Sequence, residues 1–334
     1  MKKIKVLFDG FYDGEDYTKN KEATMIIGLL KKHYAVEFSE QPEYIFCNVN
    51  SKEYYKYDGI RIFCTVEAIC PDFNLCDYGI GFEYIEYGDR YFRFPNSYYY
   101  PGLVSTMLNK HKEIKENMAE RKFCSFVYSN DKAEKIRGEL FKKISEYKQV
   151  ESGGKYLNNL PGNRAVENKI QFESEHKFSI ACENASFPGY HTEKLVEAFA
   201  AQTIPIYWGD PCVEKFFNSK AFINCNKYDS VEEIIKEVKR LDENNDEYLK
   251  MLMEPAVKKE ERENVDEQKR LEELENYLIY IIEQPIEQAY RRNRGFWGKQ
   301  YQQRMINEGG IIEKYNTFRN IKLVQKLRKI KGRK

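Results

Sequence analysis

Histidine is scarce in this sequence. Only four histidines occur among 334 residues, and no two of them stand at the spacing of a metal-binding pair. Eight cysteines are present, but none forms a CxxC pair, and most lie in apolar runs such as YIFCNV and FSIAC. This pattern predicts buried, reduced thiols in a cytosolic protein, with a zinc site or disulfide bonds as the alternatives. We expect no metal site built from side chains.

Long hydrophobic runs are also missing. No apolar segment reaches 18 residues, so the sequence predicts no membrane-spanning helix. The N-terminal residues MKKIKVLFDG have a basic start, but the apolar run before Asp9 is too short for a signal peptide. We therefore expect a cytoplasmic protein.

The net charge is close to zero, because the chain has 54 basic and 53 acidic residues. This balance argues against a nucleic-acid binder that works through its whole surface. Residues 319–334, however, carry eight Lys or Arg and no acid, which leaves the other 318 residues at −7. In residues 318–330 an apolar residue recurs every third position with cations between, as in a basic amphipathic helix.

We interpret this tail as a peripheral anchor on an anionic membrane surface, here the inner face of the membrane. A flexible solubilising tail, or a helix that docks on the protein's own body, is the alternative.

Short apolar runs alternate with helical patterns along the chain. Such alternation predicts an α/β protein with parallel sheets, and two successive α/β units predict two domains with a cleft between them. The predicted strands cover residues 4–8, 44–49, 60–66, 123–129, 178–182 and 203–208. The predicted helices cover residues 21–33, 103–121, 132–147, 232–241 and 258–283, and one more begins at 193.

The stretch from Phe178 to Pro211, FSIACENASFPGYHTEKLVEAFAAQTIPIYWGDP, is the most informative. A buried strand ends at Cys182, and the polar residues Glu183 and Asn184 follow at its carboxyl end. Open α/β sheets bind ligands at this end of their strands. The sequence therefore predicts a ligand site there.

A helix N-terminus follows in the same stretch. Thr192 is the expected N-cap, and the free N–H groups of the first turn favour an anion. Lys194 in that turn opposes the helix dipole, so we interpret it as a partner for an anionic ligand and Glu193 as an acceptor for ribose hydroxyls. Two merely solvated side chains are the alternative.

This stretch resembles the signature of the α-1,3/1,4-fucosyltransferases, glycosyltransferase family 10, in its bacterial form. The family pattern is an F-x-x-x-x-E-N strand end, then Y-x-T-E-K, then P-I-Y-W-G-x-P. All its fixed positions are present here: Phe178, Glu183, Asn184, Tyr190, Thr192, Glu193, Lys194, Pro205, Ile206, Tyr207, Trp208, Gly209 and Pro211. The resemblance covers roughly residues 60–255.

The resemblance implies a GT-B fold, in which two Rossmann-like α/β domains face each other across a cleft. It implies inverting transfer of L-fucose from GDP-fucose to a galactosyl-GlcNAc type acceptor, with an α-1,3 linkage and a Lewis x-type product. The corresponding division is an acceptor-binding domain at 1–118, a donor-binding domain at 119–285, and C-terminal helices with the basic tail at 286–334.

The family's acceptor segment is similar to Thr65–Phe82, and it places the catalytic base at Glu67. Here the sequence reads Thr-Val-Glu-Ala, where bacterial relatives often have Gly-Glu-Asn. Asp72 and Asp77 therefore stay open as alternative bases.

The segment Lys122–Asn130, followed by Arg137, is similar to the family's second donor-side segment, whose Arg contacts the diphosphate. Arg137 and Lys194 are thus expected to hold the departing diphosphate, whose charge grows in the transition state. The further contacts implied for the donor come from Ser129, Asn130, Asn184, Tyr190 and Glu193.

No D-x-D acidic pair stands near the donor motif, so we expect no obligatory metal or other cofactor. Two alternatives for the function stay open. One is a family relative that uses another nucleotide-diphosphate sugar, and the other is a non-catalytic nucleotide-sugar binder. The net charge of −7 on the other 318 residues disfavours a nucleic-acid role for the tail.

Overall fold

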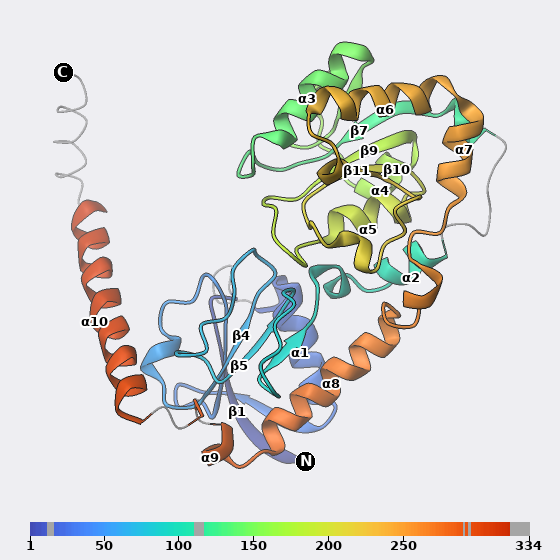
Figure 1. Cartoon of the computed structure of the whole chain (residues 1–334). Helices are drawn as coiled ribbons and strands as arrows, with labels where there is room; N and C mark the ends of the chain where they lie inside the picture. The colour runs from blue at the N-terminus through green and yellow to red at the C-terminus, as the bar shows by residue number, and fades with distance from the viewer. Residues whose placement is uncertain (12–16, 110–116, 290, 293–294, 321–334) are drawn as a thin grey trace, which may run out of the picture. The chain divides into compact units, whose positions relative to one another are not determined.

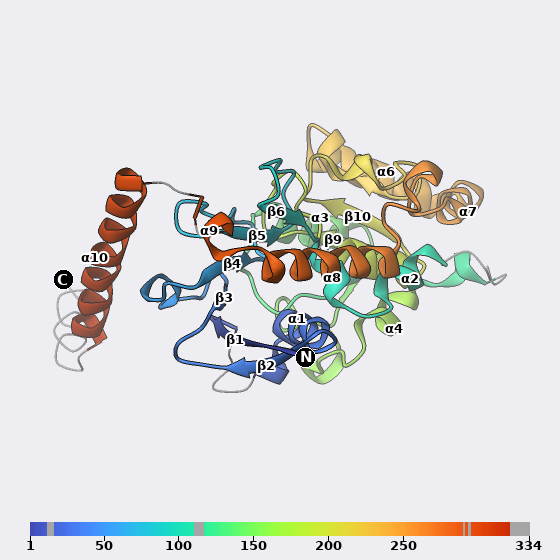
Figure 2. The same ribbon diagram turned by 90° about the horizontal axis from the view of Figure 1, so that it is seen from below.

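The computed structural model describes the chain over residues 1–11, 17–109, 117–289, 291–292 and 295–320. The chain divides into two compact units (Figures 1 and 2). The first unit comprises Met1–Cys64, Pro71–Gly79 and Tyr280–Lys334, and the second comprises Thr65–Cys70 and Ile80–Ile279. Each unit is thus built from segments that are separated in the sequence. The predicted division at 1–118, 119–285 and 286–334 uses continuous segments instead, and it stays a prediction.

One sheet has six strands in the order β2-β1-β3-β4-β5-β6. Strands β1 to β4 pair in parallel, with Val6 opposite Tyr44 and Tyr44 opposite Ile60. Strands β3 and β4 are buried along their whole length, which is typical of a parallel sheet covered on both faces. The strands are β1 (Lys2–Asp9), β2 (Tyr34–Phe38), β3 (Tyr44–Cys47), β4 (Ile60–Cys64), β5 (Tyr78–Gly81) and β6 (Tyr91–Arg93).

The second sheet has five parallel strands in the order β11-β10-β9-β7-β8. The chain moves from β7 outward to β8, then returns to place β9 on the other side of β7. The strand order therefore reverses between β7 and β9, and α/β sheets bind ligands at the carboxyl ends beside such a switch point. The strands are β7 (Lys122–Phe126), β8 (Val150–Ser152), β9 (His176–Cys182), β10 (Ile204–Trp208) and β11 (Ile223–Asn224).

Helices cover this second sheet (Figure 1). Its core contains Phe126, Leu140, Phe178 and Ile206, each at most 1% exposed. The sheet-covering helices are α3 (Ile136–Tyr147), α4 (Lys169–Ser174), α5 (Glu193–Ala200), α6 (Val231–Glu243) and α7 (Asn245–Met253). The other helices are α1 (Lys21–Lys31), α2 (Leu103–Leu108), α8 (Glu267–Glu283), α9 (Ile286–Ala289) and α10 (Gly295–Asn320).

All six predicted strands are confirmed, but three predicted helices had wrong bounds. Of the helix predicted over 103–121, α2 ends at Leu108, residues 110–116 lie outside the described residues, and Met118–Glu120 forms a short 3₁₀ turn. The helix predicted to begin at 132 begins at Ile136, and the one predicted from 258 begins at Glu267. The helix that begins at Glu267 follows Asp266, whose side chain accepts from the N–H of Lys269 at 3.0 Å and so caps the helix.

All eight cysteines are free, and the predicted burial is confirmed for six of them. Cys70 is exposed and Cys212 is half-buried. No helix within the described ranges is long and apolar enough to span a bilayer. The predicted amphipathic tail at 318–330 lies, beyond Asn320, outside the described residues.

Candidate active site

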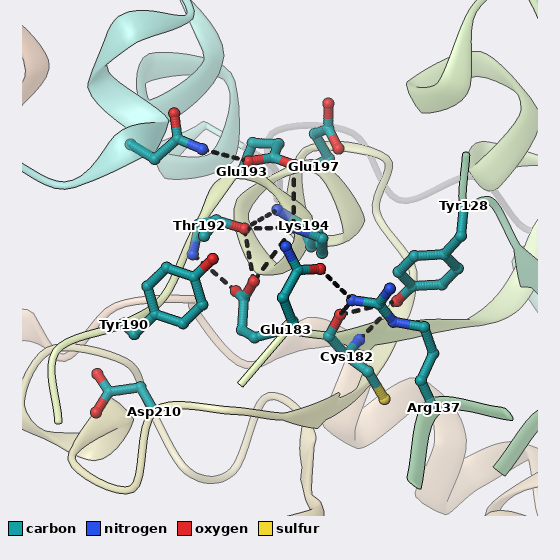
Figure 3. Close-up of polar contacts among 12 residues, drawn as sticks. Tyr128, Arg137, Cys182, Glu183, Tyr190, Thr192, Glu193, Lys194, Glu197 and Asp210 are labelled. Carbon is teal, nitrogen blue, oxygen red and sulfur yellow. Dashed lines mark hydrogen bonds and ion pairs between the residues drawn. The ribbon is translucent and has the colours of Figure 1, made fainter. Parts of the chain in front are cut away.

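Two strand ends meet at the switch point of the second sheet. Tyr128, Ser129 and Asn130 follow β7, whereas Glu183 and Asn184 follow the neighbouring strand β9. Most of the residues that the sequence predicted for the donor site gather here (Figure 3).

Glu183 is the centre of this cluster. Its side chain is fully buried, and its carboxylate accepts hydrogen bonds from the backbone N–H and the hydroxyl of Thr192, both at 2.7 Å. The Nζ atom of Lys194 is a third donor, 3.3 Å from Oε2. A buried carboxylate needs such donors, so Glu183 fixes the position of the helix that follows.

Helix α5 begins as predicted. Thr192 is its N-cap, and the Thr192 hydroxyl accepts from the backbone N–H of Lys194. The hydroxyl of one residue therefore caps the helix and binds Glu183 at the same time. This double contact joins the end of β9 to the start of α5.

Two glycines allow the close packing of this loop. A Cβ atom on Gly209 would lie 2.4 Å from Cγ of Glu183, which no side chain could tolerate. Gly189 has φ +88°, and a Cβ atom there would lie 2.6 Å from the Phe82 carbonyl oxygen. Its N–H donates to the buried carboxylate of Asp210 at 2.8 Å.

Lys194 is held by three oxygen atoms. Its Nζ lies 3.0 Å from the Thr192 hydroxyl and 3.3 Å from carboxylate oxygens of both Glu183 and Glu193 (Figure 3). Burial acts to lower the pKa of Lys194, but the two carboxylates outweigh it and the pKa is raised. The side chain therefore stays a cation at the positive end of α5.

Arg137 extends from α3 toward the same strand ends. The residue is 2% exposed, and Nη2 donates to the Asn184 side chain at 2.6 Å and to the Cys182 carbonyl at 3.1 Å. Its guanidinium carbon lies 4.2 Å from the centre of the Tyr128 ring. Within the described ranges, its Nε is buried without a hydrogen-bond partner. Arg137 and Asn184 are thus joined by a hydrogen bond at the carboxyl end of β9.

Tyr190 connects this cluster to the predicted base. The tyrosine is 2% exposed, and its hydroxyl donates to Oε2 of Glu67 at 3.5 Å. Burial, and after it the charges of Glu183 and Glu67, raise the pKa of Tyr190, so the hydroxyl keeps its proton. Glu67 itself is exposed, in a turn that the Thr65 hydroxyl holds through the N–H and C=O of Glu67, both at 3.1 Å.

The two alternative carboxylates have structural partners. Asp72 accepts from the Asn74 N–H at 2.8 Å and from the Tyr301 hydroxyl at 3.0 Å. Asp77 is fully buried, accepts from the Arg61 N–H at 2.9 Å, and pairs with Arg291. Because these two contacts are made to Oδ2 and the backbone N–H of Arg291 donates to Oδ1, both oxygens of Asp77 are engaged, which disfavours it as a base.

Ser129 and Asn130 lie at the exposed end of the β7 loop. The Asn130 side chain accepts from the N–H of Lys132 at 2.9 Å and so shapes the turn. The donor contacts predicted for these two residues stay predictions.

Several residues of the site were not predicted from the sequence. The Tyr128 hydroxyl donates to the Ile180 carbonyl at 2.8 Å and accepts from the Cys182 N–H at 2.7 Å, so it supports the end of β9. Asn96 donates to Glu193 at 2.6 Å from a segment far away in the chain. The F-V-Y-S-N run could have indicated Tyr128, but no motif marks Asn96.

A buried charge network supports α5 from α4. Nζ of Lys169 lies 2.6 Å from Glu197 on α5 and 3.7 Å from Glu173 on its own helix. Burial raises the pKa of Glu173 to about 7.

No group of three or more His, Cys, Asp or Glu that could hold a metal ion occurs among the residues with described positions.

Two family models match the chain. Residues 6–100 match the alpha-(1,3)-fucosyltransferase FucT N-terminal domain, and residues 117–277 match the C-terminal part of glycosyltransferase family 10 (fucosyltransferase). The chain is 31% identical over 284 residues to alpha-(1,3)-fucosyltransferase FucT from Helicobacter pylori, an alignment that spans 72% of this chain and 58% of that protein. It is 33% identical over 138 residues to human 4-galactosyl-N-acetylglucosaminide 3-alpha-L-fucosyltransferase 9, across 39% of this chain and 36% of that protein. The chain thus spans little more than half, or less, of these curated relatives.

Solved structures agree with these matches. A crystal structure of alpha1,3-fucosyltransferase with GDP-fucose has a TM-score of 0.68 and 28% identity, and the match covers 83% of this chain and 90% of that one. Anabaena HepE in complex with UDP-glucose has a TM-score of 0.51 at 9% identity, which shows likeness of fold alone. The predicted α/β class of GT-B type is thereby confirmed.

Proposed function

The chain belongs to glycosyltransferase family 10, the fucosyltransferases, and from that premise we propose that it transfers L-fucose from GDP-fucose to a hydroxyl group of a GlcNAc-containing acceptor. The observation that carries the proposal is the grouping of two cations, the buried Arg137 and the half-buried Lys194, at the switch point, with Glu67 hydrogen-bonded to Tyr190 beside them. A related structure contains GDP-fucose.

The leaving group is the first chemical problem in this reaction. Negative charge grows on the diphosphate as the sugar–oxygen bond breaks, and fixed cations stabilise that charge. Arg137 supplies a planar fork suited to two oxygen atoms, while Lys194 supplies a point charge at the N-terminus of α5. Their hydrogen bonds to Asn184, Glu183 and Thr192 hold both cations in place before the donor arrives.

The acceptor proton is the second problem. Inverting displacement needs a base that removes this proton as the hydroxyl oxygen attacks the anomeric carbon on the face opposite the diphosphate. Glu67 fits this role because it is an exposed carboxylate that accepts a hydrogen bond from the hydroxyl of Tyr190 at 3.5 Å. Tyr190 keeps its proton and so orients the carboxylate without neutralising it.

The remaining site residues position the donor. We propose that Glu193, held by Asn96 at 2.6 Å, accepts from the ribose hydroxyls. Asn184 contacts the fucose or the phosphate, and Ser129 and Asn130 contact the nucleotide at the end of β7. No metal is needed, because the two cations provide the positive charge.

For the acceptor we propose a galactosyl-GlcNAc terminus, an α-1,3 linkage and a Lewis x-type product. The support comes from two relatives: the bacterial one is an alpha-(1,3)-fucosyltransferase, and the human one is a 4-galactosyl-N-acetylglucosaminide 3-alpha-L-fucosyltransferase. Incubation with GDP-fucose and a panel of type 1 and type 2 disaccharides, with mass detection, tests this. Fucosylation of type 1 acceptors alone would contradict the α-1,3 assignment.

The donor is tested separately by ligand-induced stabilisation. A ligand that binds only the native state raises its melting temperature, so GDP and GDP-fucose should shift the transition of the full chain and UDP should not. An equal shift with UDP would favour the alternative, a relative that uses another nucleotide sugar. Binding of GDP-fucose without any transfer would favour the non-catalytic binder.

The basic tail at residues 319–334 supports a further part of the proposal, a peripheral position on the inner face of the membrane. Each basic residue near an anionic surface contributes about 1 kcal/mol, so eight of them suffice for salt-sensitive binding. The full chain should co-sediment with anionic vesicles at low salt and be released as salt rises. A chain truncated near Tyr315 should lose that binding and keep its activity on soluble disaccharides, and equal partitioning of both would refute the anchor.

A further inference from the structure

Asn96 contacts the donor site from a segment that lies 97 positions earlier in the sequence. Its Nδ2 atom donates to Oε2 of Glu193 at 2.6 Å, and both residues belong to the second unit. Asn96 is 8% exposed, and the Glu193 side chain is 18% exposed. The contact thus lies mostly out of solvent, where a hydrogen bond to a charged acceptor is stronger than at an exposed site.

The backbone that carries Asn96 is held by its neighbours. Pro95 precedes it with φ −58°, the value that the proline ring fixes, and residues 96–99 form a 3₁₀ turn. In that turn the buried Tyr98 donates its hydroxyl to the Val265 carbonyl at 3.2 Å. The amide of Asn96 therefore extends from a backbone position that is fixed before any ligand binds.

The Glu193 carboxylate is held through both of its oxygen atoms. Asn96 donates to Oε2, and Nζ of Lys194 lies 3.3 Å from Oε1, at the first turn of α5 (Figure 3). The last torsion of a glutamate side chain has a broad distribution, so contact to one oxygen defines the carboxylate plane poorly. The Asn96 amide fixes that plane, and because it is neutral it adds no second cation beside the carboxylate.

Recognition of a ribose depends on such a fixed plane. Two neighbouring hydroxyls can both donate to one carboxylate only where its plane faces them, because hydrogen bonds weaken steeply as their angle departs from linear. A nucleotide that lacks both hydroxyls gains nothing from this orientation. A residue that fixes the plane should therefore affect the affinity for a ribonucleotide and leave that for its dideoxy analogue nearly unchanged.

We propose that Asn96 is a positioning residue for the sugar donor, which orients Glu193 toward the ribose hydroxyls and so sets the preference for a ribonucleotide. This proposal rests on the proposed function, in which Glu193 accepts from those hydroxyls. It assigns no donor contact to Asn96 itself, because the amide acts through Glu193. Ser97, the next residue of the same turn, is 3% exposed and provides a matched control position.

GDP and 2′,3′-dideoxy-GDP are the probes, titrated calorimetrically into the full chain. The unmodified chain should bind GDP at least roughly tenfold more tightly, because charge-assisted hydrogen bonds to the ribose are present only with GDP. Asn96→Leu keeps about the same side-chain volume without the donor, and it should weaken GDP roughly fivefold or more while changing dideoxy-GDP affinity less than about twofold. Ser97→Ala should keep the full preference.

Steady-state kinetics with GDP-fucose give a second readout. The ribose contact is made in both the ground state and the transition state, so its loss in Asn96→Leu should raise KM more than it lowers kcat. A loss confined to kcat would overturn the proposal.

Glu193→Ala separates this proposal from the function on which it rests. If the unmodified chain shows no preference for GDP, or Glu193→Ala keeps the preference, Glu193 does not bind the ribose and both proposals for these residues are wrong. If Glu193→Ala loses the preference but Asn96→Leu keeps it, or Asn96→Leu weakens both nucleotides equally, only the role of Asn96 is wrong.

Two further tests apply if Asn96→Leu fails to fold. Asn96→Ala removes the same donor and should show the same selective loss of GDP affinity. A crystal of the unmodified chain grown with GDP should show Nδ2 of Asn96 within hydrogen-bond distance of the Glu193 carboxylate, which in turn contacts a ribose hydroxyl. An Asn96 amide turned away from Glu193 in that crystal would overturn the proposal.

Discussion

Replacement of Lys194 by methionine removes one charge from the donor cluster and keeps most of the side-chain volume. In the structure its ammonium group lies between Glu183 and Glu193, 3.3 Å from each, and 3.0 Å from the Thr192 hydroxyl. The variant leaves the fully buried Glu183 carboxylate with Thr192 as its remaining donor residue. We therefore expect Lys194→Met to destabilise the second unit even without ligand.

The size of this effect follows from the contacts. Removing one partner of a buried ion pair costs about 3–5 kcal/mol. Two hydrogen bonds from Thr192, both at 2.7 Å, continue to satisfy Glu183, and 14% of the Lys194 side chain is exposed. We therefore expect a cost below that range, about 2–3 kcal/mol, and a melting temperature lowered by roughly 5–10 °C for a unit of this size.

A double-mutant cycle with Glu183→Gln isolates the ion pair. If the two charges interact as described, Lys194→Met should lower the free energy of unfolding by less than about 1 kcal/mol in the Glu183→Gln background, because the neutral amide leaves no unpaired charge in the interior. Urea unfolding of the four proteins gives the coupling energy. Additive costs, or an unchanged melting temperature for Lys194→Met, would show that the pair does not organise the loop; an unchanged GDP-induced shift in that variant would remove Lys194 from the donor site.

Four other predictions test separate parts of the site. Arg137→Ala should weaken GDP binding roughly 10- to 100-fold by calorimetric titration, because a charge-assisted contact to the diphosphate is lost; near-normal affinity would contradict the assignment. Glu67→Gln should lower the transfer rate about 10²–10⁴-fold at unchanged GDP affinity. Asp72→Asn should keep its turnover, because the Asp72 carboxylate accepts hydrogen bonds from Asn74 and Tyr301, and the reverse outcome would show that Asp72 is the base. Activity in excess EDTA should equal that without it, and loss restored by Mn²⁺ or Mg²⁺ would require a metal. Burial raises the pKa of Glu173 from 4.5 to about 7, so between these pH values the unfolded chain loses this proton while the folded chain keeps it, and up to about 3 kcal/mol of stability should be lost as the pH rises. Glu173→Gln should flatten that decline in unfolding experiments from about pH 5 to about 7.5, and parallel pH profiles would refute the reasoning.

The strands and the start of α5 were predictable because their signals are local. Continuous apolar runs such as Ile204–Trp208 leave few alternatives to a buried strand. Thr192 is a favoured N-cap residue and so predicts the start of a helix, and that helix begins at the next residue. The start of the helix predicted over 258–283 was wrong because its first residues are nearly all charged and carry no apolar period, whereas Asp266, whose side chain accepts from the N–H of Lys269 at 3.0 Å, caps the helix that begins at Glu267.

The candidate site was predictable in part for a similar reason. Glu183, Tyr190, Thr192 and Lys194 lie within one short stretch, so a single motif and one strand end place them together. Arg137 and Glu67 were found through two further segments of the family pattern. The structure adds their physical link, since Arg137 bonds to Asn184 and Glu67 to Tyr190.

What could not be predicted is the support of these side chains by residues far away in the chain. The motif marks Glu193 but says nothing of Asn96, which is 97 positions away and donates to it at 2.6 Å. Lys169 reaches Glu197 across 28 positions, and nothing around Lys169 distinguishes it from any other lysine of a polar helix. Such partners are chosen by the three-dimensional requirement that every buried charge has an opposite charge or a hydrogen bond, and that requirement acts on the folded chain. Sequence motifs therefore mark the residues predicted to contact a ligand, whereas the residues that fix the pKa and position of those side chains emerge only from the structure.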